Sequence, residues 1–259
     1  ITKQINISIL ITLVAMILGK NFGDTDYPSL VYSEHTYGMM ALALVTCIFG
    51  LFANKNLILA TTFSMILVSL HPMIGIWILF IIFIGIFFSK SYKFYKIELL
   101  RGALIGSCLL ISSFLFFYFN TIHQLQYNPD LFQNYLKNWD GHRSINEIVH
   151  YEYIAKTILL LSLIIFFVDK KDYNVHLIII AVSGILSLII YLIFKIFPNI
   201  FPLSILIAMP SRFIMLHTLI GWPIIISIIY SFLIRRYNFK NISIFFTIFL
   251  VALLIQNFS

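Results

Sequence analysis

The sequence predicts an all-α membrane protein: a polytopic transmembrane helix bundle of about nine membrane-spanning helices, forming one integral membrane domain over residues 1–259. Three observations support this prediction. Of the 259 residues, 61% are hydrophobic and only 10% are charged, and the mean hydropathy is +0.98. Apolar segments recur along the whole chain rather than at one end. The basic residues stand mostly in short segments between apolar runs, where they act as topology signals.

The first apolar run, residues 5–19, predicts a short span that leads from the inside to the outside. Residues 20–38 are too polar to cross a membrane and should form an outer loop. Residues 39–53 are expected to return to the inner side. Because the sequence begins at Ile1 rather than at Met, we also expect that a portion upstream is missing.

The next run, residues 56–88, contains 33 residues and no charge. As one helix it would be about 50 Å long, whereas the hydrocarbon core of a membrane is about 30 Å thick. Pro72 lacks an amide proton and disfavours helical geometry at the residue before it. We therefore predict two short helices, residues 56–70 and 73–88, that turn at His71-Pro72 below the outer surface. Such a hairpin leaves both basic flanks on the inner side.

After a basic loop at residues 89–96, a strong span is predicted over residues 97–119. The outer loop that follows, residues 120–153, contains an amphipathic segment at 129–139 whose apolar residues are spaced three and four apart. The remaining spans are expected at residues 154–168, 175–197, 213–234 and 242–258.

This topology sorts the charges, with the N-terminus on the inner side of the membrane. Because the basic residues serve as topology signals, we expect membrane lipid and no nucleic acid as a partner. Seven of the ten acids fall outside and eleven of the seventeen Lys and Arg fall inside, the latter at positions 3, 55, 90, 93, 96, 101, 170, 171, 235, 236 and 240.

The same topology gathers polar side chains on the outer face, where they could line a pocket for an anionic substrate. Solvation of ordinary loops explains many such residues equally well. His71 has a structural alternative, capping the hairpin turn by hydrogen bonds to free carbonyls, and Arg212 could simply reach the headgroups. The candidate binding residues are Glu34, His35, His71, Asp140, His142, Arg143, Arg212 and His217.

Chemistry can be assigned to some of these residues. Arg212 follows Pro210-Ser211 at the start of a helix, where a guanidinium and free amides suit a phosphate. Asp24 or Asp26 could act as the general base that takes a proton from an acceptor hydroxyl. With Glu34 and His35 this pair could instead bind a divalent cation through oxygen atoms, although the sequence defines no metal site and no cofactor.

The acidic first outer loop, the SLHPMIGIW hairpin and the late MPSRF segment support a resemblance. The chain resembles uncharacterised bacterial polytopic inner-membrane proteins, and it is similar in plan to the GT-C class of glycosyltransferases. That resemblance implies an enzyme that uses a polyprenyl-phosphate-linked sugar at the outer face. It would make Asp24 or Asp26 the catalytic base and Arg212 a phosphate contact. The first helix is expected to be shorter than in that class, and we expect no soluble C-terminal domain within residues 1–259.

Two alternatives remain open. A transporter or lipid-handling protein would use His71, Arg212 and His217 to bind a substrate or relay protons at membrane depth. A structural or assembly component would use its polar residues only to satisfy the backbone. The sequence does not decide between an enzyme and a transporter.

Overall fold

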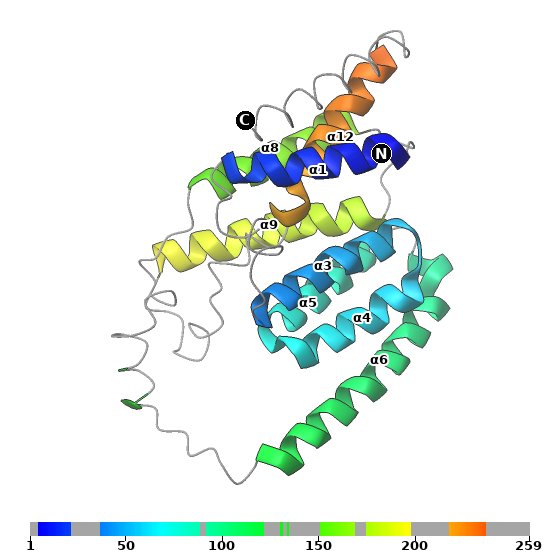
Figure 1. Ribbon diagram of the computed structural model, residues 1–259, viewed down its shortest axis with the longest axis vertical. Coiled ribbons are helices and arrows are strands. Elements are labelled where there is room, and N and C mark those ends of the chain that lie inside the picture. Colours follow the sequence, from blue (N-terminus) through cyan, green and yellow to red (C-terminus); the bar gives the residue numbers. More distant parts are fainter. Residues whose placement is uncertain are drawn as a thin grey trace. The chain divides into compact units, whose positions relative to one another are not determined.

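Long apolar runs form helices here, one of them with Pro223 inside it. A computed structural model describes residues 5–21, 37–88, 92–121, 130, 131, 134, 151–168, 175–197 and 218–236. Within these residues the chain forms eight α-helices and no strand (Figure 1), which confirms the all-α prediction. The helices are α1 (Ile5–Asn21), α3 (Tyr37–Ala53), α4 (Leu57–Leu70), α5 (Pro72–Phe88), α6 (Tyr92–Thr121), α8 (Tyr151–Phe167), α9 (Val175–Ile196) and α12 (Thr218–Arg236).

One helix is long and apolar enough to cross a membrane among the described residues, over Tyr95–Asn120 in α6. The other seven helices have shorter apolar stretches of 10 to 17 residues, and 17 residues of helix are about 26 Å long. That is less than the roughly 30 Å of a hydrocarbon core. The prediction of about nine spans is therefore not confirmed by helix length.

The chain divides into two units, each built from separate segments of the sequence. Unit 1 contains α1, α8 and α12, and unit 2 contains α3, α4, α5, α6 and α9. The prediction of one domain over residues 1–259 stays a prediction.

In unit 2, α3 and α4 are joined by a tight turn at Lys55. The N–H of Asn56 donates to the carbonyl of Leu51, and the N–H of Lys55 donates to the carbonyl of Phe52. This pair of bonds is the Schellman motif that closes many helices. Lys55 takes the left-handed position of that motif, with φ of 59°, where glycine is usual. The turn thus places a basic residue between two apolar helices, as the sequence predicts.

Helices α4 and α6 pack closely at two glycines four residues apart, Gly102 and Gly106. A Cβ on Gly102 would lie 2.5 Å from the carbonyl oxygen of Ile58, and one on Gly106 would lie 2.6 Å from the Cβ of Met65. The hydroxyl of Thr62 donates to the carbonyl of Gly102 across the helices at 3.1 Å. Small residues spaced in this way let helix backbones approach inside membranes, where a hydroxyl can bond across the interface.

These contacts also fix the direction of the helices. Moving four residues along α6, from Gly102 to Gly106, moves the contact from Ile58 to Thr62 on α4. The two helices therefore run parallel. The predicted topology requires this direction, because both segments are expected to lead outward from the inner side.

Beyond this contact, α6 leaves its neighbours. Every residue from Ile111 to Asn120 is exposed on all sides of the helix, and Figure 1 shows this end of α6 separating from the other helices of unit 2. The exposed side chains include four phenylalanines, among them Phe116 and Phe119 with 73% and 72% of their surface accessible. A helix that is apolar all round is typical of a membrane span.

Unit 1 has its core around Tyr230 of α12, which is fully buried. Ile7, Ile11 and Val14 of α1 pack with it. Their spacing of four and three residues places them on one face of α1. On another face of α12, the ring of Phe232 meets that of Phe167 of α8 with centroids 4.8 Å apart.

Some predicted elements differ from the structure or lie outside it. Helix α6 begins at Tyr92, inside the predicted basic loop at 89–96, where no proline or glycine opposes a helix. In the predicted amphipathic segment only residues 130, 131 and 134 are described, and all three are helical. The predicted last span, residues 242–258, lies outside the described residues.

Candidate functional site

His71 forms the turn between α4 and α5, as the sequence predicts. Its N–H donates to the carbonyl of Leu67 at 2.8 Å, and its own carbonyl accepts the N–H of Gly75 at 2.9 Å. The residue is extended, with φ of −146°, and Pro72 follows as the first residue of α5. Proline suits that position, since it lacks the amide proton that a helix leaves unused there.

The imidazole of His71 caps the N-terminus of α5. Its Nδ1 accepts the backbone N–H of Ile74 at 3.4 Å, which is the bond that an N-cap side chain makes to the third residue of a helix. The expected capping role is therefore found, but the partner is an amide and not a carbonyl. Because Nδ1 accepts this hydrogen bond, a neutral ring carries its proton on Nε2.

Gly75 lets the two arms of the His71 hairpin close. A Cβ at this position would lie 2.4 Å from the Cα and 2.5 Å from the amide nitrogen of Val68. The backbones of α4 and α5 are therefore in contact at Val68 and Gly75, each about one helical turn from His71. We use the name His71 hairpin for α4, α5 and the turn between them.

The contact of α4 with α6 is defined near the middle of α4. A Cβ on Gly106 would lie 3.0 Å from the carbonyl oxygen of Thr62, nine residues before His71. Beyond that contact, every residue of α6 from Ile111 to Asn120 is exposed. The expected depth of the turn, below the outer surface, stays a prediction.

The other predicted site residues lie outside the described part of the chain, so the structure neither assembles nor separates them. They are Asp24, Asp26, Glu34, His35, Asp140, His142, Arg143, Arg212 and His217. Their proposed roles stay predictions. Among the described residues, no group of three or more His, Cys, Asp or Glu side chains could hold a metal ion.

Sequence reasoning overlooked Lys156, a buried cation in α8. Only 6% of its surface is accessible, and neighbouring Thr157 is buried as well. The signal was present: Lys156 is a lysine within the apolar run 154–168, and ionisable residues inside such runs are rare and often functional.

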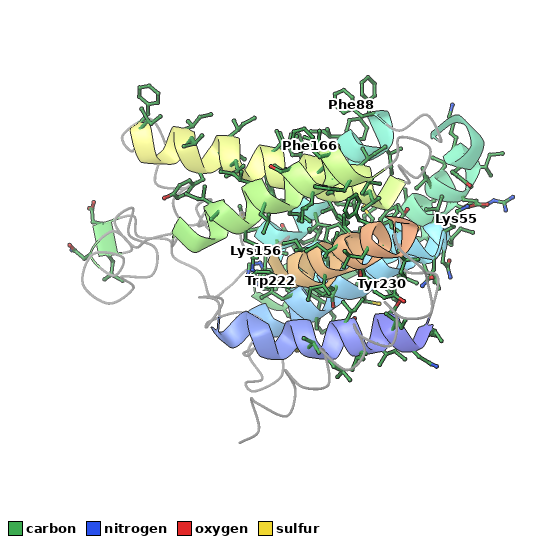
Figure 2. All side chains as sticks on the ribbon, turned by 90° about the horizontal axis from the view of Figure 1, so that it is seen from above. Lys55, Phe88, Lys156, Phe166, Trp222 and Tyr230 are labelled. Atoms are coloured by element: carbon green, nitrogen blue, oxygen red, sulfur yellow. The ribbon has the colours of Figure 1, made fainter. Side chains whose placement is uncertain are left out.

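The side chain of Lys156 lies between α8 and α12 (Figure 2). Its Nζ lies 5.8 Å from the centroid of the Trp222 ring, within the range of a cation–π interaction. Its Cδ and Cε lie 3.8 and 3.9 Å from where a Cβ on Gly221 would be. The aliphatic part of the lysine therefore passes beside Gly221 at ordinary van der Waals distance.

Helices α8 and α12 run parallel. Near their beginnings Lys156 meets Trp222, and near their ends Phe167 meets Phe232, so both helices advance together. The predicted topology again requires this direction, since both segments are expected to enter from the outer side. Lys156 and Trp222 thus lie in the first halves of their helices.

Comparison with protein-family models, with curated proteins and with solved structures gives no match for this chain.

Proposed function

We propose that this chain is an integral protein of a bacterial cytoplasmic membrane that acts at the outer face on a polyprenyl-phosphate-linked sugar. It would cross the membrane about nine times with its N-terminus inside. The observation that supports the topology in this proposal is the direction of the helices. Two pairs distant in sequence, α4 with α6 and α8 with α12, are each parallel, as this topology requires.

The proposed topology places the acids of the first loop on the same side as Arg212. Asp24 or Asp26 would take a proton from the acceptor hydroxyl, and Arg212 would hold the phosphate of the donor. Sugar transfer from a lipid phosphate needs both functions at one membrane face. The resemblance in plan to GT-C enzymes supports the same division of roles.

Replacing the two aspartates tests the enzyme. The Asp24→Asn and Asp26→Asn variants, singly and together, keep the size of the side chains and remove their basicity. Surface glycans are then measured by mass spectrometry, with the amount of protein in the membrane checked by immunoblot. Asp172→Asn, on the predicted inner side, is the matched control. We expect loss of the glycan in at least one single variant and in the double variant, whereas unchanged glycans in the double variant would reject the proposal.

A transporter is the second candidate, and the His71 hairpin favours it. Helices interrupted at membrane depth are typical of transporters, where they form binding sites for substrates and ions. In this case His71 would bind the substrate or carry a proton in addition to capping α5.

Two substitutions at His71 separate transport from capping. Asparagine can cap a helix but cannot relay a proton, whereas alanine can do neither. In liposomes, a transporter that uses the imidazole should lose substrate-dependent proton flux in both variants. If His71→Asn keeps full flux and only His71→Ala loses it, His71 contributes its cap alone and the proton-relay role is wrong.

A further inference from the structure

Arg101 is a cation on α6, inside the stretch Tyr95–Asn120 that is long and apolar enough to cross a membrane. Its side chain is exposed, and so is that of Lys96, about one and a half turns earlier. Neither side chain forms an ion pair or a hydrogen bond within the part of the chain that the structure describes. A cation exposed on a membrane helix costs free energy unless an anion accompanies it. An anion from outside the chain would lower that cost.

The carboxylate nearest in sequence does not supply the missing charge. Glu98 lies between the two cations on α6, three residues before Arg101, a spacing at which helical side chains can pair. The structure shows Glu98 half-buried and without an ion pair to any described residue. Helix α4, which meets α6 at Gly102, contains no charged residue. The described neighbour of α6 thus offers no partner for the guanidinium.

An exposed apolar strip adjoins the two cations on α6. It consists of Ile97, Leu100 and Leu104, with 65%, 57% and 59% of their surface accessible. At about 100° per residue, these three side chains point away from Gly102 and Gly106, the glycines that meet α4. By the same helical geometry, one cation stands on each side of the strip. We call Ile97, Leu100 and Leu104 the α6 strip.

The direction of the side chains suits a lipid headgroup. Long side chains on a helix lean toward its N-terminus, and α6 begins at Tyr92. Lys and Arg lay their aliphatic stems along apolar surface and carry their charges toward the headgroups. Both charges therefore lean toward the beginning of α6, while the α6 strip continues along the helix. A charged group at a membrane surface above an apolar strip matches the two parts of a phospholipid.

We propose that Arg101 and Lys96 together bind the phosphate of an anionic phospholipid, whose acyl chains lie along the α6 strip. A guanidinium can donate two parallel hydrogen bonds to one phosphate, and lysine adds a point charge. Two cations favour a headgroup with a net negative charge, because the cationic part of a zwitterionic headgroup would be repelled. This inference rests on the membrane location in the proposed function and not on its sugar-transfer chemistry.

The experiment measures lipid binding to the purified full chain in a non-ionic detergent by thermophoresis. The protein is titrated with phosphatidylglycerol, which is anionic, and with phosphatidylcholine of the same acyl chains, which is zwitterionic. Soluble glycerol phosphate is the third probe, because it offers the phosphate without acyl chains. The measured quantity is the ratio of the dissociation constants for phosphatidylcholine and phosphatidylglycerol, which we call the anionic preference.

The variants separate the site from general attraction to positive charge. Arg101→Gln and Lys96→Gln, singly and together, remove the charges and keep polar side chains. Lys55→Gln is the matched control: Lys55 is exposed in the turn before α4 (Figure 2), and α4 meets the glycine face of α6 and not the α6 strip. Glu98→Gln tests whether pairing with a carboxylate explains Arg101.

Each Lys or Arg near a membrane surface strengthens binding to anionic lipid by about fivefold. The wild type should therefore show an anionic preference of about 25-fold. Arg101→Gln and Lys96→Gln should each lower it about fivefold, and the double variant should abolish it. Lys55→Gln should keep the preference, and so should Glu98→Gln. Glycerol phosphate should bind more weakly than phosphatidylglycerol, because it has no acyl chains for the α6 strip.

Five results would overturn the inference. They are no anionic preference in the wild type, an intact preference in the double variant, an equal loss in Lys55→Gln, a loss in Glu98→Gln, or glycerol phosphate binding as tightly as phosphatidylglycerol. If Arg101→Gln fails to give monodisperse protein, Arg101→Met replaces it and is judged by the same criterion.

The two proposals fail separately. Because this assay needs no sugar transfer, a negative result here leaves the aspartate test of the proposed function unaffected. Unchanged glycans in that test would likewise leave an anionic preference that depends on Arg101 and Lys96 standing.

Discussion

Replacing Gly75 by alanine should open the His71 hairpin. The new Cβ would lie 2.4 Å from the Cα of Val68, about 1 Å inside the closest ordinary contact between carbon atoms. Both atoms of the clash belong to rigid parts of helices, and the turn at His71 joins those helices only one turn away. The arms must therefore separate, which weakens the packing of Leu67 and Trp77. Inserting one carbon into a filled interface costs about 1 to 3 kcal/mol.

The matched control is Gly50→Ala in α3, where a Cβ would meet no atom within 4 Å. Alanine favours a helix over glycine by about 1 kcal/mol, so this variant should be slightly more stable than the wild type. Thermal unfolding of the purified protein in detergent, followed by circular dichroism, compares the two. If Gly75→Ala melts at the same temperature as Gly50→Ala, the close contact between α4 and α5 is wrong.

Four further substitutions have measurable outcomes in the same unfolding assay. Thr62→Val loses the hydrogen bond to Gly102 and should cost about 0.6 kcal/mol, whereas Thr46→Val, whose hydroxyl bonds only within its own helix, should cost less; equal costs would argue against the bond between helices. His71→Ala should cost about 0.5 to 2 kcal/mol through the lost cap and His71→Asn only a few tenths, so an equal loss in both would argue against capping. Tyr230→Ala empties the core of unit 1 and should cost about 3 to 5 kcal/mol, and a loss below 1 kcal/mol would contradict that packing. Lys55→Gly removes the steric cost of a Cβ on a left-handed residue and should raise the free energy of unfolding by about 1 kcal/mol. A lower free energy of unfolding would contradict the turn.

Much of the helical framework could be predicted because its signals are local. The break at His71-Pro72 follows from a proline in a run too long for one span, and the observed arms, Leu57–Leu70 and Pro72–Phe88, lie within one residue of the predicted ones. The end of α3 at Ala53 follows from the polar residues after it. Charge sorting predicted the relative directions of α4 and α6, although neither segment reveals its neighbour by itself.

Other features depend on tertiary packing that periodicity does not encode. Nothing in the sequence shows that Gly102 and Gly106 meet α4 rather than another helix, because small residues suit many partners. The capping alternative for His71 named carbonyl groups as its partners, whereas the imidazole accepts a hydrogen bond from the N–H of Ile74. An imidazole can donate or accept a hydrogen bond, and the geometry of the turn decides which. Lys156 was overlooked because charge sorting treats lysine as a loop residue, whereas here its stem fills the space beside Gly221.

The most direct test of the account is the side of the membrane on which each end of the His71 hairpin lies. Single cysteines are introduced by Lys55→Cys, Lys90→Cys and His142→Cys in a background with Cys47→Ser and Cys108→Ser. Intact cells are then treated with a maleimide that cannot cross the inner membrane. We expect labelling of position 142 only, with positions 55 and 90 both labelled after the membrane is opened. Labelling of either position 55 or position 90 from outside would contradict the hairpin, and with it the outward location proposed for His71.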